Sequence, residues 1–223
     1  MKPSRRRLLV LLLLAAGLLT LTLLPFLSRR TLETRLTAAM GRPASVGGLR
    51  YRLAPLGIEI TDLRIAGPTP EAPPLLEVPL AEVVPSLPAL WSRQIALARL
   101  RLVGPRMRVH FFGDGTNDLP VPASGAGTAG VAIRRLVIEA GELELNHDRV
   151  PLQLDLPDVS GRMARHAGSL AGTLSFGPGR AQFGAAPPLD ASLELELALQ
   201  PKGVEIQRLR LRTPGTALAG KGR

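Results

Sequence analysis

The sequence predicts a mainly β protein, in which an N-terminal transmembrane helix and a short second helix precede an extended, curled antiparallel β-sheet that forms an open groove. Three observations support this fold class. A long uncharged run lies near the N-terminus, apolar and polar residues alternate with a period of two after residue 44, and a strand pattern recurs about every 36 residues.

The uncharged run covers residues 8–27. At about 1.5 Å per residue, a helix of this length spans the roughly 30 Å hydrocarbon core of a bilayer. The alternative is a cleaved signal peptide, but its apolar region would be shorter and would end in a small-residue cleavage site. We therefore predict a single-pass membrane anchor that includes Leu8, Leu12, Leu18, Leu23 and Leu27.

The charges around this run predict its orientation. Lys2 and residues 5–7 are basic and precede it, so the positive-inside rule places the N-terminus in the cytoplasm. No second apolar run of spanning length follows, so we expect the bulk of the chain on the far side of the membrane.

We expect five regions in the chain. These are a cytoplasmic tip with the membrane anchor (1–30), a short amphipathic helix (31–43), a first β region (44–119), a flexible loop (120–130) and a continuing β region (131–223).

The short helix is predicted by Leu32, Leu36 and Met40, which recur at helical spacing before Gly41 and Pro43. It either plugs one end of the sheet or lies along the membrane surface.

Alternation with a period of two is clearest at residues 189–200, where Leu or Ala occupies every second position and Asp, Ser or Glu occupies most positions between. This pattern is typical of a strand with one apolar and one wet face. The one acidic, Gly-rich loop, from Gly113 to Asp118, lacks the spacing and the late Glu of a calcium loop, and it predicts a hairpin turn.

A repeat of the form Φ-x-Φ-x-x-Φ-x-Φ, where Φ is an aliphatic residue, occurs at residues 58–65, 95–102, 131–138 and 204–211. A strict period of two would turn the second pair to the opposite face, so we expect a β-bulge or bend at the two-residue step. We also expect a turn after each unit, at Gly67-Pro68, Gly104-Pro105, Ala140-Gly141 and Thr213-Pro214. Chance alternation in an Arg- and Leu-rich chain is the alternative.

The repeats, together with the alternating strand at residues 189–200, give the candidate lipid-facing residues of the groove. No amphipathic helix after Met40 is available as a second layer, so the apolar face must curl around a ligand such as phospholipid acyl chains. The candidates are Ile58, Ile60, Leu63, Ile65, Leu100, Leu102, Leu136, Ile138, Leu193, Leu195, Leu197, Leu209 and Leu211.

Composition argues against several function classes. The net charge is +10, but Lys2, Arg5, Arg6, Arg7, Arg29 and Arg30 supply +6 of it, and Arg and Glu are mixed along the rest, so we predict no nucleic-acid partner. The chain has no Cys, its three His are scattered, and no nucleophile, zinc or phosphate-loop motif is present. We therefore predict no catalytic residues, no metal, no cofactor and no enzymatic activity.

The arrangement resembles the AsmA-like superfamily, which includes TamB-like proteins. The resemblance rests on the anchor RRRLLVLLLLAAGLLTLTLLPF, on GRPASVGGLRYRLAPLGIEITDLRIAGP, and on PLLEVPLAEVVPSLPALWSRQIALARLRLVGPRMRVHFFGDGTNDL with its DG-x-N turn. The later segments RRLVIEAGELELN and RLRLRTPGTALAGKGR continue it.

The resemblance implies a Gram-negative inner-membrane protein with a taco-shaped β-groove in the periplasm. It implies phospholipid traffic between the inner and outer membranes, or, for TamB-like members, assembly of outer-membrane proteins, and it supplies no catalytic residues. Family members are usually much longer, so we expect the chain to be truncated within a repeat.

Three functions remain open from sequence. The first is lipid transfer along the groove. The second is an assembly factor whose open sheet edge binds client strands by strand addition. The third is a structural or adhesive β-repeat protein without a ligand.

Overall fold

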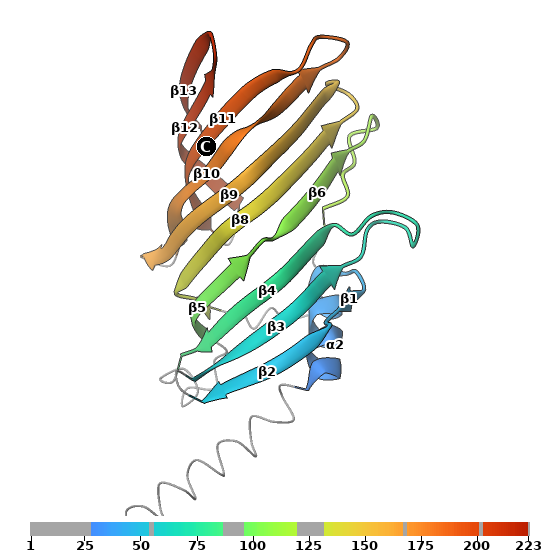
Figure 1. The fold of residues 1–223 in the computed structure, drawn as a ribbon, viewed down its shortest axis with the longest axis vertical. Coiled ribbons are helices and arrows are strands. Elements are labelled where there is room, and N and C mark those ends of the chain that lie inside the picture. The colour runs from blue at the N-terminus through green and yellow to red at the C-terminus, as the bar shows by residue number, and fades with distance from the viewer. Residues whose placement is uncertain are drawn as a thin grey trace, which may run out of the picture.

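The part of the chain that the structure describes forms a single large β-sheet with one helix packed at its N-terminal end (Figure 1). This computed structural model describes residues 28–53, 56–86, 96–119, 132–166, 169–200 and 203–222. The sheet has 13 strands, and its main path runs β1-β3-β4-β5-β8-β9-β10-β11-β12-β13, while β2 pairs with β3, β6 with β4 and β8, and β7 with β5. The sequence-based prediction of a mainly β protein is thus confirmed.

The strands of the first β region are β1 (Ala44–Ser45), β2 (Gly48–Leu53), β3 (Leu56–Ile65), β4 (Leu76–Pro85), β5 (Ala96–Val103) and β6 (Arg106–Phe111). Those of the second are β7 (Ala132–Ile133), β8 (Arg135–His147), β9 (Leu152–His166), β10 (Ser169–Phe183), β11 (Leu189–Gln200), β12 (Gly203–Thr213) and β13 (Thr216–Gly222).

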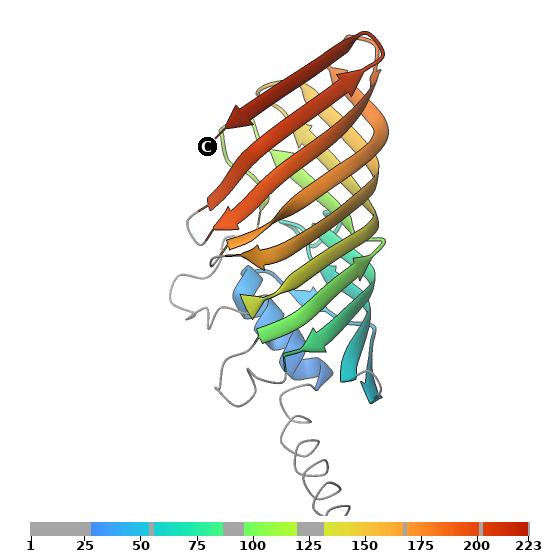
Figure 2. The same cartoon turned by 90° about the vertical axis from the view of Figure 1, so that its left-hand side faces the viewer.

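Helix α2 (Arg29–Met40) forms where the leucine spacing predicts it. The Ser28 side chain accepts a hydrogen bond from the Thr31 backbone N–H at the start of the helix, and Gly41 ends it in the left-handed conformation. In both views the helix lies on one side of the sheet, and strands β11 to β13 curve toward that same side (Figures 1 and 2).

The predicted all-antiparallel sheet is wrong, because the sheet is mixed. Strand β5 pairs with β7 and β8 in parallel, and β6 also pairs with β8 in parallel. Leu100 lies opposite Leu136 and Arg106 opposite Glu142, so both pairs are separated by 36 residues (136 − 100 and 142 − 106). The 36-residue repeat therefore places equivalent residues of successive units opposite one another in this parallel pairing. Parallel neighbours require a long crossover connection.

Two predicted turns are also wrong. Strand β8 continues through Ala140-Gly141, and strands β5 and β6, on either side of Gly104-Pro105, both pair with β8. Instead of reversing, the chain kinks: Ala140 has φ 51° and Gly104 has φ 63°. The predicted turn at Gly113 to Asp118 is confirmed, since the Phe112 N–H bonds to the Thr116 carbonyl and the Asp118 N–H to the His110 carbonyl.

These irregularities align across neighbouring strands in a row that we call the kink line. Asp62 in β3 (φ 51°) and Pro79 in β4 lie between the paired positions Thr61–Leu80 and Leu63–Val78. A Cβ added to Gly104 would lie 3.6 Å from Pro79 and 4.0 Å from the Ala140 carbonyl. The row continues through β9 and β10. Its members are Asp62, Pro79, Gly104, Ala140, Asp158 and Gly177.

The expected bulges are found at the two-residue steps of the repeats. The pairing of β11 with β12 passes from Glu196–Arg208 to Leu197–Ile206, so Gln207 is the extra residue. The β4–β5 pairing passes from Val84–Arg99 to Pro85–Leu97, so Ala98 in the step is the extra residue. Strand β7 ends and β8 begins on either side of Arg134. In the first copy the step holds left-handed Asp62.

Several predictions fall outside the described residues. These are the membrane anchor with Leu8, Leu12, Leu18, Leu23 and Leu27, and the flexible loop at 120–130. Among the residues that are described, no helix is both long and apolar enough to cross a membrane.

Substitutions at Ala140 test the kink line. Because a left-handed backbone disfavours a β-branched side chain, Ala140→Val should destabilise the fold by about 1–3 kcal/mol, while Ala140→Gly should stabilise it by up to about 1 kcal/mol. Chemical unfolding followed by circular dichroism measures both effects. Ala164→Val, at an exposed strand position with ordinary φ, is the control and should have little effect; an equal loss at both sites would contradict the kink.

Candidate functional site: the apolar face of the sheet

Two rows of aliphatic side chains cross the sheet on one face, and they contain most of the candidate groove residues. Strand register defines the rows, because residues opposite one another on paired strands lie on the same face. The first row is Ile58, Val83, Leu100, Leu136, Met163, Gly172, Leu197 and Ile206. The second is Ile60, Ala81, Leu102, Ile138, Gly161, Leu174, Leu195 and Leu209.

The kink line keeps residues beyond it on this same face. Val78 and Ala81 are three positions apart in β4, yet both are buried in one cluster with Ile60 and Val46, against which Leu63 also packs. A second cluster combines Leu156 and Val159 of β9, also three positions apart, with Phe176. Without a kink between them, the members of each pair would point to opposite faces.

The remaining candidates also lie in this surface. Ile65 is buried and lies opposite Leu76, which packs on the first cluster. Leu193 packs on the second cluster and lies opposite Leu211 in β12. The structure thus brings every candidate groove residue into one sheet face or its continuation past the kink line.

Sequence reasoning missed the contribution of β9 and β10. Leu156, Val159, Met163 and Phe176 are buried at 2%, 9%, 4% and 7% exposure, and none was a candidate. A signal for them exists, because Leu154-x-Leu156-x-x-Val159 has the same two-residue step as the four repeats. Gly161, two residues after Val159 in β9, and Gly172, two residues before Leu174 in β10, weaken the aliphatic pattern of these strands.

Glycine at position 172 is required by close packing of β9 against β10. A Cβ at Gly172 would collide with the Arg162 carbonyl and come within 2.7 Å of the Met163 Cα. Across the same strand pair, the Leu174 side chain lies over Gly161. Large and small residues thus alternate where these rows meet.

The opposite face of the sheet carries ion pairs between adjacent strands. Between the two apolar rows, one residue of each strand points to this opposite face. Paired from strand to strand, these residues are Glu59, Glu82, Arg101, Val137, Arg162, Thr173, Glu196 and Arg208. Arg101 donates to Glu139 with both Nε and Nη2, at 3.1 and 2.6 Å, and lies 3.2 Å from Glu82. Arg208 pairs with Glu196 at 2.9 Å. The two faces therefore differ sharply in polarity.

The apolar face is covered at its N-terminal end by α2. Leu32 packs against the first cluster. Glu33 accepts a hydrogen bond from the Val46 backbone N–H at 2.9 Å, and Arg29 donates to the Gly47 carbonyl at 3.2 Å. The hydrogen bond from the Val46 backbone N–H and, to a smaller extent, the one from the Arg29 side chain lower the pKa of Glu33 below its ordinary value. The helix is therefore fixed to the sheet as the predicted plug would be.

Farther along the sheet, the apolar face lacks such a cover within the described residues. All partly buried residues that pack on the second cluster come from the sheet itself, namely Ile138, Leu143, Leu154, Leu174, Leu193 and Leu195. Phe183 and Leu189, near the ends of β10 and β11, are 58% and 57% exposed. A surface of this kind is suited to an apolar ligand or partner.

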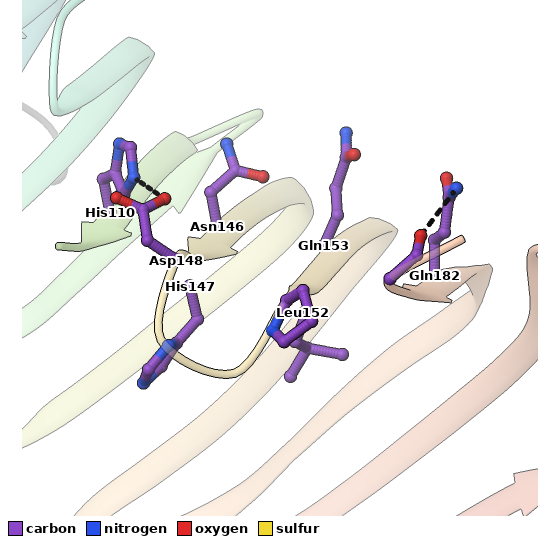
Figure 3. A pocket seen from close by; sticks show the side chains of 9 residues that line it. His110, Asn146, His147, Asp148, Leu152, Gln153 and Gln182 are labelled. Atoms are coloured by element: carbon purple, nitrogen blue, oxygen red, sulfur yellow. Dashed lines mark hydrogen bonds and ion pairs between the residues drawn. The ribbon is translucent and has the colours of Figure 1, made fainter. Parts of the chain in front are cut away.

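A polar pocket of about 450 Å³ lies at the ends of β6, β8, β9 and β10 (Figure 3). His110 Nε2 lies 2.7 Å from Asp148 Oδ1, and His147 Nδ1 accepts a hydrogen bond from the Val150 N–H. The other labelled polar side chains are the amides of Asn146, Gln153 and Gln182. No Ser, Thr or Cys lines this pocket, and the described residues contain no metal-binding group of three His, Asp or Glu.

Comparisons with known proteins found no matching family model, no matching curated protein and no matching solved structure.

The pKa of Glu139 offers a test of the ion pairs. Its hydrogen bonds to Arg101 lower this pKa, so Glu139 stabilises the fold above the ordinary glutamate pKa of about 4.3, and the contribution is lost as the pH falls through the lower folded-state value. In Arg101→Gln we expect the Glu139 pKa to rise toward its ordinary value, measured by NMR titration of labelled glutamate. Arg108→Gln, which removes pairs with Glu77 and Glu144, should leave it unchanged; no rise in the Arg101 variant would contradict the pairing.

Proposed function

We propose that this chain is an inner-membrane-anchored, periplasmic protein of Gram-negative cell-envelope biogenesis, which carries phospholipids between the inner and outer membranes. The curved sheet acts as an open groove, and its apolar rows contact acyl chains. The resemblance of the sequence to AsmA-like proteins supports the location and the cargo.

One observation carries the proposal: the aliphatic rows continue from β3 to β12, whereas α2 packs at the β1–β4 end alone. In a water-soluble sheet, a face of this composition is normally buried by a second layer. Strands are about 4.8 Å apart, so the eight strands of the main path from β3 to β12 give a continuous apolar surface roughly 34 Å long. Such a surface accepts several acyl chains side by side.

Site-specific photocrosslinking tests the proposal on the full chain in its native membrane. A photocrosslinking residue replaces Leu195 on the apolar face or, as the matched control, its neighbour Glu194 on the polar face. After irradiation, mass spectrometry identifies the adducts. We expect phospholipid adducts at position 195 and at least tenfold fewer at 194. Equal yields at both positions, or no lipid at 195, would exclude the groove.

The alternative is that the chain assembles outer-membrane proteins by strand addition. It is favoured by β13, which pairs with β12 alone in the part of the chain that the structure describes. An open edge can bind an extended client segment through backbone hydrogen bonds. The test places a photocrosslinking residue at position 217 in β13 or, as the control, at position 164 in central β9. Protein adducts at position 217 and none at position 164 would favour this function over lipid transport.

A further inference from the structure

Exposed apolar side chains gather at one end of strands β8 to β11. Among the side chains that the structure describes, the large hydrophobic ones that are exposed belong to Tyr51, Val150, Phe183 and Leu189. Tyr51 lies on β2, but the other three lie at the β8–β9 and β10–β11 turns. These turns are adjacent, because Phe183 lies opposite Leu152 and the Gly184 N–H donates to the Pro151 carbonyl at 2.6 Å. We call Val150, Phe183, Leu189 and the turn at 184–188 the apolar tip.

The apolar tip continues the apolar face of the sheet. Leu189 lies opposite Ala181, which in turn lies opposite Leu154 of β9. Leu154 packs on the second cluster, and Leu152 precedes it by two positions in the same strand, so both lie on one face. Phe183 and Leu189, their register partners, therefore border the apolar face where the strands end.

The turn of the apolar tip has few polar groups. Residues 181–189 carry no charge. The Gly184 N–H is already bonded to Pro151, the Ala186 N–H donates to the Phe183 carbonyl at 3.0 Å, and the two prolines at 187 and 188 have no N–H. A turn of a sheet normally carries polar residues, whereas this one loses little hydrogen bonding with water when it enters an apolar environment.

The charges beside the apolar tip leave a positive group free. Asp148 of the β8–β9 turn points to the polar pocket, where its Oδ1 lies 2.7 Å from His110 Nε2 (Figure 3). Arg149 is exposed next to Val150 and makes no ion pair with the residues that the structure describes. A guanidinium at this place complements the phosphates of a lipid surface.

We propose that the apolar tip inserts into the surface of a phospholipid bilayer, as a contact separate from the predicted N-terminal anchor. Aromatic and aliphatic side chains beside a basic residue are favoured at the boundary of headgroups and acyl chains, about 5–10 Å deep. A protein partner fits less well, because an ordinary protein interface carries about ten direct hydrogen bonds and the tip offers few free donors.

This inference goes beyond the proposed function and does not depend on it. The apolar tip can hold the sheet against a membrane whether or not the apolar rows carry lipid. Where they do, the bilayer adjoins the apolar face at Phe183 and Leu189, so a lipid can pass from one to the other without crossing water.

A fluorescent label at the apolar tip tests this contact on the full chain. The chain has no Cys, so Ala186→Cys takes a single environment-sensitive dye. The labelled protein is reconstituted in liposomes of phosphatidylethanolamine and phosphatidylglycerol. A nitroxide-bearing lipid is placed either in these liposomes or in protein-free vesicles added to them. In one of the two arrangements we expect quenching about fivefold stronger at position 186 than at position 164, an exposed site near the other end of β9.

Polar substitutions test whether the apolar side chains themselves cause the contact. Phe183→Ser/Leu189→Ser should reduce quenching at position 186 to the level at position 164, and circular dichroism should be unchanged because both side chains are more than half exposed. Tyr51→Ser, at an exposed hydrophobic residue far from the tip, is the matched control and should leave the quenching unchanged.

Equal quenching at positions 186 and 164 in both arrangements would overturn the proposal. Dye emission that shifts to the blue with protein concentration, without nitroxide quenching, would also overturn it, because copies of the chain would then cover the apolar tip. Neither result affects lipid photocrosslinking at position 195, so the membrane contact and the lipid groove can fail separately.

Discussion

The side-chain alternation of β-strands is the constraint on which this structure depends. A long strand must interrupt its period of two if residues on both sides of a two-residue step are to share one face. Asp62, Ala140 and Asp158 adopt left-handed conformations at such interruptions, and Pro79 and Gly104 lie between them. Because the interruptions align from strand to strand, they form one line across the sheet rather than independent defects. The apolar face then continues on both sides of that line.

An apolar face of this kind must be covered from water, and α2 covers the part of it near β1 to β4. Leu32 and the hydrogen bond from Val46 to Glu33 hold the helix on the first cluster, where β1 to β4 meet. The second cluster, centred on Leu156, Val159 and Phe176, packs within the sheet. Strands β11 to β13 curve toward the side of the sheet on which α2 lies (Figure 2). The remaining exposed apolar area is the physical basis for expecting a ligand.

Much of this architecture could be predicted from the sequence because the responsible forces are local. Alternation indicated the strands, leucine spacing with Gly41 indicated α2, and the two-residue step indicated bulges such as the one at Gln207. The parallel pairing of β5 with β8 could not be predicted, because it depends on a crossover rather than on either strand's own pattern. Ala140-Gly141 has turn composition, but in β8 the left-handed residue serves a kink. Leu156 and Phe176 were missed because glycines interrupt the aliphatic pattern of their strands, at Gly161 in β9 and at Gly172 and Gly177 in β10.

The pairing of charges is a second consequence of the same geometry. Ion pairs such as Arg106–Glu142 and Arg108–Glu144 join residues opposite one another in parallel register, so a 36-residue repeat with complementary charges neutralises itself. Arg101 extends this pattern across three strands, because it pairs with Glu82 of β4 and with Glu139 of β8. Arg101 alternates with the row members Leu100 and Leu102 along β5, so its side chain lies on the opposite face. The alternation that gathers aliphatic side chains on one face therefore gathers ion pairs between strands on the other.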